Sequence, residues 1–188
     1  MKPLPVPLPS GGGATERELE SFVCDALSSC IMLERYPRCV IQVVIQIVQA
    51  DGSVPGVAVN CAVLALMDAC VAMRMIPVAS TTCVVASKTC QESQQQLNDN
   101  INSVWMDPSA EEESADGHSI VVFVTEADSN DDDKAPEIIT SFTYGAPVSM
   151  SGLLHCMDCG RKYNTAMVTF TRMAEKQKVE QEVETLWS

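Results

Sequence analysis

Residues 37–75 read PRCVIQVVIQIVQADGSVPGVAVNCAVLALMDACVAMRM, and this stretch decides the fold. Residues 39–49 are β-branched and almost wholly apolar, which predicts a strand covered on both faces. Residues 50–56 are expected to turn, because Asp-Gly and Pro-Gly pairs interrupt the apolar pattern. Residues 57–75 carry apolar and small side chains at helical spacing, which predicts a helix packed closely against a sheet.

The rest of the chain shows the same mixture of helical and alternating patterns. A helix is expected to start at Thr15, an N-cap residue followed by the acidic first-turn residues Glu16 and Glu18. The expected helices cover residues 16–34, 57–74 and about 149–185, and the expected strands cover residues 39–49, 80–88, 101–106, 118–126 and 137–144. The pattern indicates an α+β domain in which helices pack on a sheet.

Length and composition favour a single globular domain. The chain has 188 residues, of which 46% are hydrophobic, enough for one sizeable core. Asn60, Asp68 and Arg74 interrupt the most apolar helix before it reaches membrane length, so no membrane association is expected. The net charge of −13 comes from 25 acidic and 12 basic residues, and it argues against tight RNA binding by the chain alone.

Much of the acidic charge lies in segments that read as loops. Residues 1–14 form a Pro/Gly-rich lead, and residues 15–188 form the domain, with a polar insert at 91–103 and an acidic insert at 126–134. Without these loops the domain is nearly balanced in charge, with Arg35, Arg38, Arg74, Arg161 and Lys162 among its basic residues. A subunit that contributes a few cations to a shared RNA channel is compatible with this distribution.

The nine cysteines are interpreted as reduced thiols of a cytosolic or nuclear protein. Six of them lie in apolar periodic segments and are expected to be buried as small hydrophobic residues: Cys24, Cys30, Cys39, Cys61, Cys70 and Cys83. Cys156 and Cys159 have the spacing of half a zinc site or a redox pair, and His155 lies beside them. A zinc site needs four ligands and no second such pair is present, so core or partly buried thiols are favoured and no metal or cofactor is expected.

Two acidic features have both a functional and a structural interpretation. Asp107 with Glu111 to Glu113 could bind a divalent ion through paired carboxylates, but a solvated acidic turn is the favoured reading. Asp68 lies on an apolar helix, where we expect it to be a structural hydrogen-bonding residue.

Several short motifs, in order, resemble the RNase PH family. Within it, the closest likeness is to the RNase PH-like ring subunits of the eukaryotic RNA exosome, of the type called ribosomal RNA-processing protein 46. The family's Ala-Asp-Gly turn matches residues 50–52, and its Asp-Pro-Ser followed by acidic residues matches 107–113. Residues 138–154 match its last strand and C-terminal helix. The helix after the turn matches the family pattern at Asn60, Ala62, Ala65, Leu66, Asp68 and Ala69.

The resemblance covers roughly residues 15–180 and implies an RNase PH-like (ribosomal protein S5 domain 2-like) fold. The family has a strand-rich portion before the first helix. We therefore expect the chain to be N-terminally incomplete, either because the gene model is truncated, which we favour, or because the lineage has lost that portion.

Departures from the family pattern predict that the chain is not an enzyme. Phosphorolytic members carry a Thr/Ser-Arg pair after Asp-Gly, whose Arg holds the attacking phosphate, whereas this sequence has Val54 and Pro55. Neither side chain can donate a hydrogen bond, and Pro55 also lacks a backbone N–H. The family's second catalytic Asp falls at Ser119 in the alignment we favour. No catalytic residue is therefore assigned.

Three functional hypotheses follow from the sequence. The first is a non-catalytic scaffold subunit of the exosome ring, supporting 3′→5′ RNA processing and degradation in the nucleus, nucleolus and cytoplasm. Its expected partners are other RNase PH-like ring subunits, cap subunits and RNA in the assembled channel, which Arg35, Arg38 and Arg74 could contact. The second is an active phosphorolytic 3′→5′ exoribonuclease, and the third is an unrelated α+β interaction domain. The Val54-Pro55 turn favours the first over the second, and the combined motifs favour it over the third.

Overall fold

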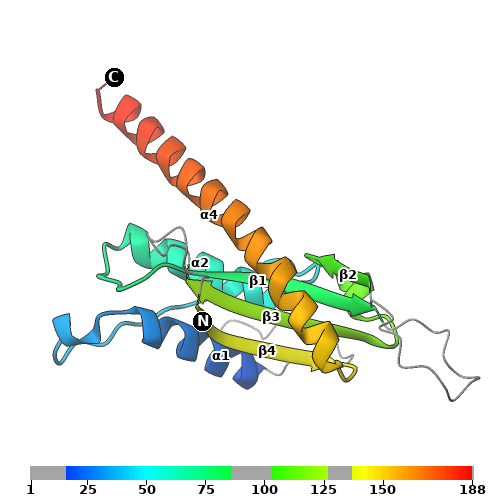
Figure 1. The fold of residues 1–188 in the computed structure, drawn as a ribbon. Helices are drawn as coiled ribbons and strands as arrows, with labels where there is room; N and C mark the ends of the chain where they lie inside the picture. The colour runs from blue at the N-terminus through cyan, green and yellow to red at the C-terminus, as the bar shows by residue number, and fades with distance from the viewer. Residues whose placement is uncertain (1–15, 86–102, 127–136, 188) are drawn as a thin grey trace, which may run out of the picture.

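The computed structural model describes residues 16–85, 103–126 and 137–187, in which helices cover both faces of a four-stranded antiparallel sheet (Figure 1). The helical elements are α1 (Glu16–Cys30), the 3-10 turn η1 (Leu33–Arg35), α2 (Val54–Asp68), α3 (Ala110–Glu113) and α4 (Met150–Trp187). The strands are β1 (Pro77–Val85), β2 (Ser103–Met106), β3 (His118–Glu126) and β4 (Ile138–Gly145), in the spatial order β2-β1-β3-β4. The expected α+β class is confirmed.

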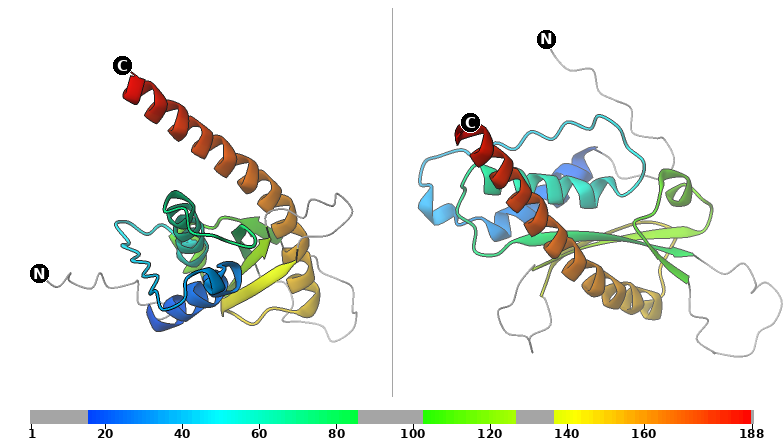
Figure 2. Two further views of the ribbon diagram at one scale, coloured as in Figure 1. Left: turned by 90° about the vertical axis from the view of Figure 1, so that its left-hand side faces the viewer. Right: turned by 90° about the horizontal axis from the view of Figure 1, so that it is seen from above.

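The two central strands are buried between two helical layers. Helices α1 and α2 cover one face of the sheet, and α4 crosses the other face (Figure 2). Successive residues of a strand point to opposite faces, so β3 supplies both layers. Ile120, Val122 and Val124 pack with α1 and α2, whereas Val121 and Phe123 pack against α4. This double burial explains why β3 reads as a nearly continuous apolar run, and in β1 it also buries the polar residues Ser80, Thr81 and Thr82.

The expected strand at residues 39–49 is wrong. The segment runs without a strand assignment outside the helical layer, on the side of α1 and α2 away from the sheet (Figure 2). Val40, Val44 and Val48 are 93%, 79% and 88% exposed. A strand is defined by backbone hydrogen bonds to a neighbouring strand, and β1 to β4 pair with one another on the far side of α2. The segment therefore has the side-chain composition of a strand without its ladder.

Helix α2 begins three residues earlier than expected and ends six residues earlier. Val54 and Pro55 form its first turn, where proline fits because the first N–H groups of a helix have no intrahelical acceptor. The helix ends at Asp68, and Cys70 takes a left-handed conformation with φ of 53°. The following residues leave the helix axis because Met73 forms an antiparallel bridge with Ile31, which also ends α1 before residue 34.

Burial of the cysteines differs from the expectation at four positions. Cys30 and Cys83 are buried as predicted, and so is Cys156. Cys24, Cys39, Cys61 and Cys70 are exposed. The exposure of these four cysteines has two causes. Cys39 belongs to the segment that does not join the sheet, and the other three lie on helical surfaces or after a helix end that faces away from the core.

Helix α4 is the longest element, and its second half extends past the sheet (Figure 1). Its first half packs on β1, β2 and β3 through Leu153, Cys156 and Met157. Further along, Lys178 Nζ lies 2.5 Å from Asp68 Oδ1 at the end of α2. Asp68 is thus a surface ion-pair partner that ties α4 to α2, in line with the structural role expected of it. In the described ranges, no helix is both long and apolar enough to cross a bilayer.

Candidate functional site

The candidate site lies where the turn before α2 meets the loop between β2 and β3. The sequence singled out both segments, and the structure brings them together across more than fifty residues of chain. Ser53 N donates to Glu113 Oε1 at 2.6 Å, and Ala110 N lies 3.4 Å from Asp51 Oδ1. Gly52 has φ of +90°, and a Cβ on it would lie 2.2 Å from the carbonyl oxygen of Pro108. Only glycine allows the two backbones to approach this closely.

The acidic loop has a defined local structure. Asp107 turns the chain with φ of 54°, and its N–H donates to Thr81 O at 3.0 Å, which extends the edge of the sheet. Ser109 and Glu112 form a capping box at the start of α3, in which Ser109 N donates to Glu112 Oε2 at 2.8 Å. Capping satisfies N–H groups that a short helix would otherwise leave unpaired. Glu112 therefore has a structural task that does not depend on a bound ion.

Glu113 is the central acid of this site. One of its carboxylate oxygens, Oε1, accepts from Ser53 N and also from Tyr144 Oη, the latter at 3.0 Å. Burial raises the pKa of Tyr144, and the negative charge of Glu113 raises it further. Tyr144 comes from β4 and Ser53 from the start of α2, so Glu113 joins three separate parts of the fold. We call this set of residues, Ser53, Glu113 and Tyr144, the carboxylate clamp.

The expected phosphate position has no cationic side chain of its own. Val54 is half-buried and Pro55 is buried in the first turn of α2. Residues 50–56 and 103–117 contain neither Lys nor Arg. At the same position the carboxylate clamp places a negative oxygen on the Ser53 N–H, the kind of backbone donor that an anion could use at a helix start.

Ser119 lies apart from Asp107. It is buried in β3, opposite Val84 of β1 and Gly145 of β4. Asp107 is level with Thr81, three residues from Val84 along β1, which corresponds to about 10 Å along the strand. It also follows β2, two strands away from β3. Ser119 and Asp107 are therefore not neighbours in the sheet.

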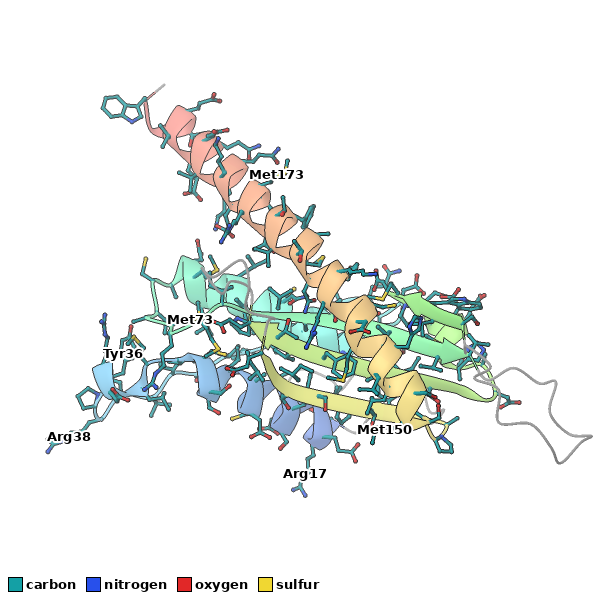
Figure 3. The ribbon with its side chains drawn as sticks, viewed as in Figure 1. Arg17, Tyr36, Arg38, Met73, Met150 and Met173 are labelled. Carbon is teal, nitrogen blue, oxygen red and sulfur yellow. The ribbon has the colours of Figure 1, made fainter. Side chains whose placement is uncertain are left out.

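The three arginines named as RNA contacts gather at one end of the molecule. Figure 3 shows Tyr36, Arg38 and Met73 at the same end of the molecule. Arg35 immediately precedes Tyr36, and the Ile31–Met73 bridge brings the neighbouring Arg74 to this corner. Arg74 forms an ion pair with Glu34. Tyr36 Oη accepts from Ala72 N at 2.8 Å, which fixes the corner. Arg35 and Arg38 are exposed.

Cys156 and Cys159 lie on different sides of helix α4. Cys156 faces the sheet and is fully buried, and burial raises the pKa of its thiol. Cys159 lies at the side of the helix, 3.9 Å from His155 Nε2. Within the described ranges, no three His, Cys, Asp or Glu side chains converge as metal ligands would.

Two structural contacts could not be predicted from the sequence. The Tyr144–Glu113 contact has no signal in the sequence, since the two residues come from separate elements. Asn60 belongs to a family-typical motif, but its task emerges only in the fold. Its Nδ2 donates to Ala79 O at 3.0 Å and its Oδ1 accepts from Ala79 N at 2.8 Å. The side chain thereby locks α2 to β1.

Known proteins resemble both the sequence and the fold. Residues 9–72 match the model of the 3′ exoribonuclease (RNase PH) family, domain 1. The exosome complex component rrp46 of Schizosaccharomyces pombe is 45% identical over 65 residues, which cover 34% of this chain and 29% of that protein. The exosome complex component Rrp41 of Pyrobaculum calidifontis is 46% identical over 59 residues, or 31% of this chain and 24% of that protein.

A solved structure extends the likeness to most of the chain. The crystal structure of rice (Oryza sativa) Rrp46 has a TM-score of 0.66 at 23% identity, covering 87% of this chain and 68% of that one. The expected RNase PH-like fold is thus confirmed, and the hypothesis of an accidental likeness fails. Residues 9–72 are thus similar to the RNase PH family, the chain has the fold of an Rrp46-type exosome component, and it spans less than a third of the length of the curated relatives given above.

Proposed function

We propose that the chain is a non-catalytic structural subunit of an RNA exosome ring. In this role it supports 3′→5′ RNA processing and degradation, including maturation of ribosomal RNA and turnover of messenger RNA. Its partners are other RNase PH-like ring subunits and cap subunits, and it works in the nucleus and nucleolus and in the cytoplasm. The names of the relatives, all exosome components, support the assembly.

The carboxylate clamp is the observation that carries the non-catalytic role. Phosphorolysis needs a phosphate ion held by fixed donors beside the RNA. At the start of α2, Glu113 already occupies the Ser53 N–H, Pro55 has no N–H, and the side chain of Val54 offers no polar group. A phosphate placed about 4 Å from the Glu113 carboxylate would be repelled by on the order of 4 kcal/mol per pair of unit charges at an effective dielectric constant of 20.

RNA contact belongs to the assembled ring in this proposal. Net charge of −13 disfavours autonomous binding, because Lys and Arg contacts to phosphates dominate affinity for nucleic acid. Arg35, Arg38 and Arg74 form a small basic surface at one corner of the molecule. The ion pair with Glu34 partly neutralises the charge of Arg74. Next to a basic surface of a neighbouring subunit, Arg35 and Arg38 would add two cations to a channel.

Activity and phosphate binding test the proposal together. Purified chain is incubated with 3′-labelled single-stranded RNA with and without inorganic phosphate, and nucleoside diphosphates are measured. No phosphate-dependent release is expected, whereas an active phosphorolytic member of the family serves as the positive control. Calorimetric titration with phosphate should detect no binding to the wild-type chain. Release that appears with phosphate and stops without it would contradict the non-catalytic role.

Assembly is tested separately. The chain is co-expressed with RNase PH-like exosome subunits, and size-exclusion chromatography shows whether it elutes with one of them. A stable complex is expected. A folded chain that ignores every subunit would contradict the ring role, whatever the activity assay shows.

A further inference from the structure

The two helical layers are attached to the sheet by apolar cores of different size. The layer of α1 and α2 shares a cluster of fourteen buried residues with the sheet, among them Phe22, Val59 and Ile120. Beneath α4, the corresponding cluster has four buried members: Val84, Val121, Phe123 and Cys156. Because hydrophobic stabilisation grows with the apolar area removed from water, α4 gains less of it than the opposite layer.

The surface on which α4 rests is polar at its centre. Alternation along the strands places Ser80 and Thr82 of β1, and Thr125 of β3, on the face that α4 covers. These three side chains are 1%, 0% and 2% exposed. Asn164 of α4 is 3% exposed, and its Nδ2 donates to Thr125 Oγ1. The helix therefore packs on hydroxyl groups at a place where a helix and a sheet usually meet through apolar side chains.

Three buried polar atoms of α4 and β1 have no hydrogen-bond partner within the described parts of the chain. They are Ser80 Oγ, Asn164 Oδ1 and Arg161 Nε. A buried polar atom without a partner loses its hydrogen bonds to water, which lowers the equilibrium constant for docking by a factor of roughly 5–150. Separation of α4 from the sheet would return all three atoms to water.

The helix itself offers little compensation where it crosses β1. Gly160 lies at this point, since a Cβ on it would be 3.0 Å from Ser80 Oγ and 3.7 Å from Phe123 Cδ2. A glycine inside a helix has no side chain to bury and weakens the helix. Further along, Lys178 and Asp68 tie α4 to α2 through an exposed ion pair, a contact that contributes little to stability.

We propose that α4 is a strap that leaves the sheet as a unit, while β1 to β4 and the layer of α1 and α2 remain folded. Residues 146–149 join β4 to α4 and form the hinge. The open state exposes a face of β1 and β3 made of valine, phenylalanine and hydroxyl side chains, which the closed state covers. Opening is a local equilibrium of the native protein, and it requires less free energy than global unfolding. The strap is a property of this helix–sheet interface and does not depend on the proposed ring.

Thiol labelling at two buried cysteines tests the strap. Cys156 lies under α4 and Cys83 lies in the opposite layer, and each is 0% exposed. The folded wild-type chain is incubated with iodoacetamide, and peptide mass spectrometry gives the labelling rate of each cysteine relative to its rate in denaturant. Protection of Cys156 should be at least about tenfold weaker than that of Cys83. Low concentrations of urea should accelerate Cys83 more steeply than Cys156, because global unfolding exposes more surface than opening of one helix.

Hydrogen exchange distinguishes opening of the whole helix from fraying of its first turns. The backbone amides of residues 160–168, in the middle of α4, should be protected to the same degree as the Cys156 thiol, whereas those of β3 should be protected at least about tenfold more. Exchange in residues 160–168 as slow as in β3 would overturn the proposal.

Two variants separate opening of the strap from global unfolding. Val59→Ala makes a cavity in the opposite layer, so it should accelerate labelling of Cys83 at least about tenfold and leave Cys156 within about twofold. Ser80→Ala removes an unpaired hydroxyl from the closed state and should slow labelling of Cys156 at least about fivefold.

Ser141→Ala, at an exposed position of β4, is the matched control and should change neither labelling rate by more than about twofold. Equal protection of Cys156 and Cys83 in the wild type would overturn the proposal. Parallel acceleration of both cysteines by Val59→Ala, or faster labelling of Cys156 in Ser80→Ala, would also overturn it.

Discussion

The contact of Asn60 with Ala79 predicts a large loss of stability in Asn60→Ala. Ala79 lies in β1 at a level that β2 does not reach, since β2 pairs only with residues 82–85. The Asn60 amide therefore takes the place of a strand on that side and satisfies both backbone groups of Ala79. Ala79 is 2% exposed, so water cannot replace the lost side chain easily.

The magnitude follows from two unpaired backbone groups. Each buried group that loses its partner costs about 1–3 kcal/mol, and relaxation of the half-buried site lowers the total, so we expect a loss of about 2–4 kcal/mol. This is a large share of the roughly 5–15 kcal/mol by which domains are stable. Asn60→Asp should cost a comparable amount, because a carboxylate accepts from Ala79 N but faces Ala79 O without a donor.

Urea unfolding followed by circular dichroism measures the effect. The midpoint should fall for Asn60→Ala while the denaturant slope stays constant, which would show that the same folded and unfolded states are compared. Gln177→Ala, which removes an exposed amide from α4, is the control and should change stability by less than about 0.5 kcal/mol. If Asn60→Ala behaved like this control, the side chain would not lock α2 to β1, and the assignment of its role would be wrong.

Three further outcomes are expected. Gly52→Ala should destabilise the fold by roughly 2–4 kcal/mol, because its Cβ would meet the carbonyl of Pro108 and its φ is positive. Gly117 is exposed and also has a positive φ, so Gly117→Ala should cost only the backbone strain of about 1 kcal/mol. Thermal unfolding distinguishes the two variants. All nine cysteines should react with a thiol reagent in denaturant without prior reduction, and a shortfall restored by reductant would reveal a disulfide. In the folded chain, burial raises the pKa of Cys83 to about 11, so Cys83 should react far more slowly than the exposed Cys61. Burial and Glu113 raise the pKa of Tyr144 in the folded state above its ordinary 10.0. The contribution of Tyr144 to the free energy of unfolding should therefore be fully present below pH 10 and decline at higher pH, where the tyrosine of the unfolded chain ionises. The free energy of unfolding of Tyr144→Phe should fall less steeply above pH 10, and equal slopes for the two proteins would refute the buried contact.

The sequence determined most of the secondary structure, because apolar periodicity records which faces of an element are buried. Strands β1 and β3 were predicted within a few residues, as their valines and isoleucines must fill two layers. Helix α1 was predicted from the N-cap residue Thr15 and an acidic first turn, and it ends at Cys30 instead of residue 34. The family motifs singled out the Asp51 turn and the acidic loop as separate segments, and the resemblance predicts that Val54 and Pro55 replace a phosphate-binding pair.

Tertiary structure decided what depends on partners distant in the chain. Residues 39–49 have the composition of a buried strand, yet a strand needs a neighbour to accept its hydrogen bonds, and composition cannot report whether one is within reach. The carboxylate clamp likewise joins Ser53, Glu113 and Tyr144 from three elements, and no local pattern marks their convergence. Local sequence encodes the faces that a segment prefers to bury, whereas hydrogen bonding and charge pairing between distant segments are fixed only when the chain has folded around them.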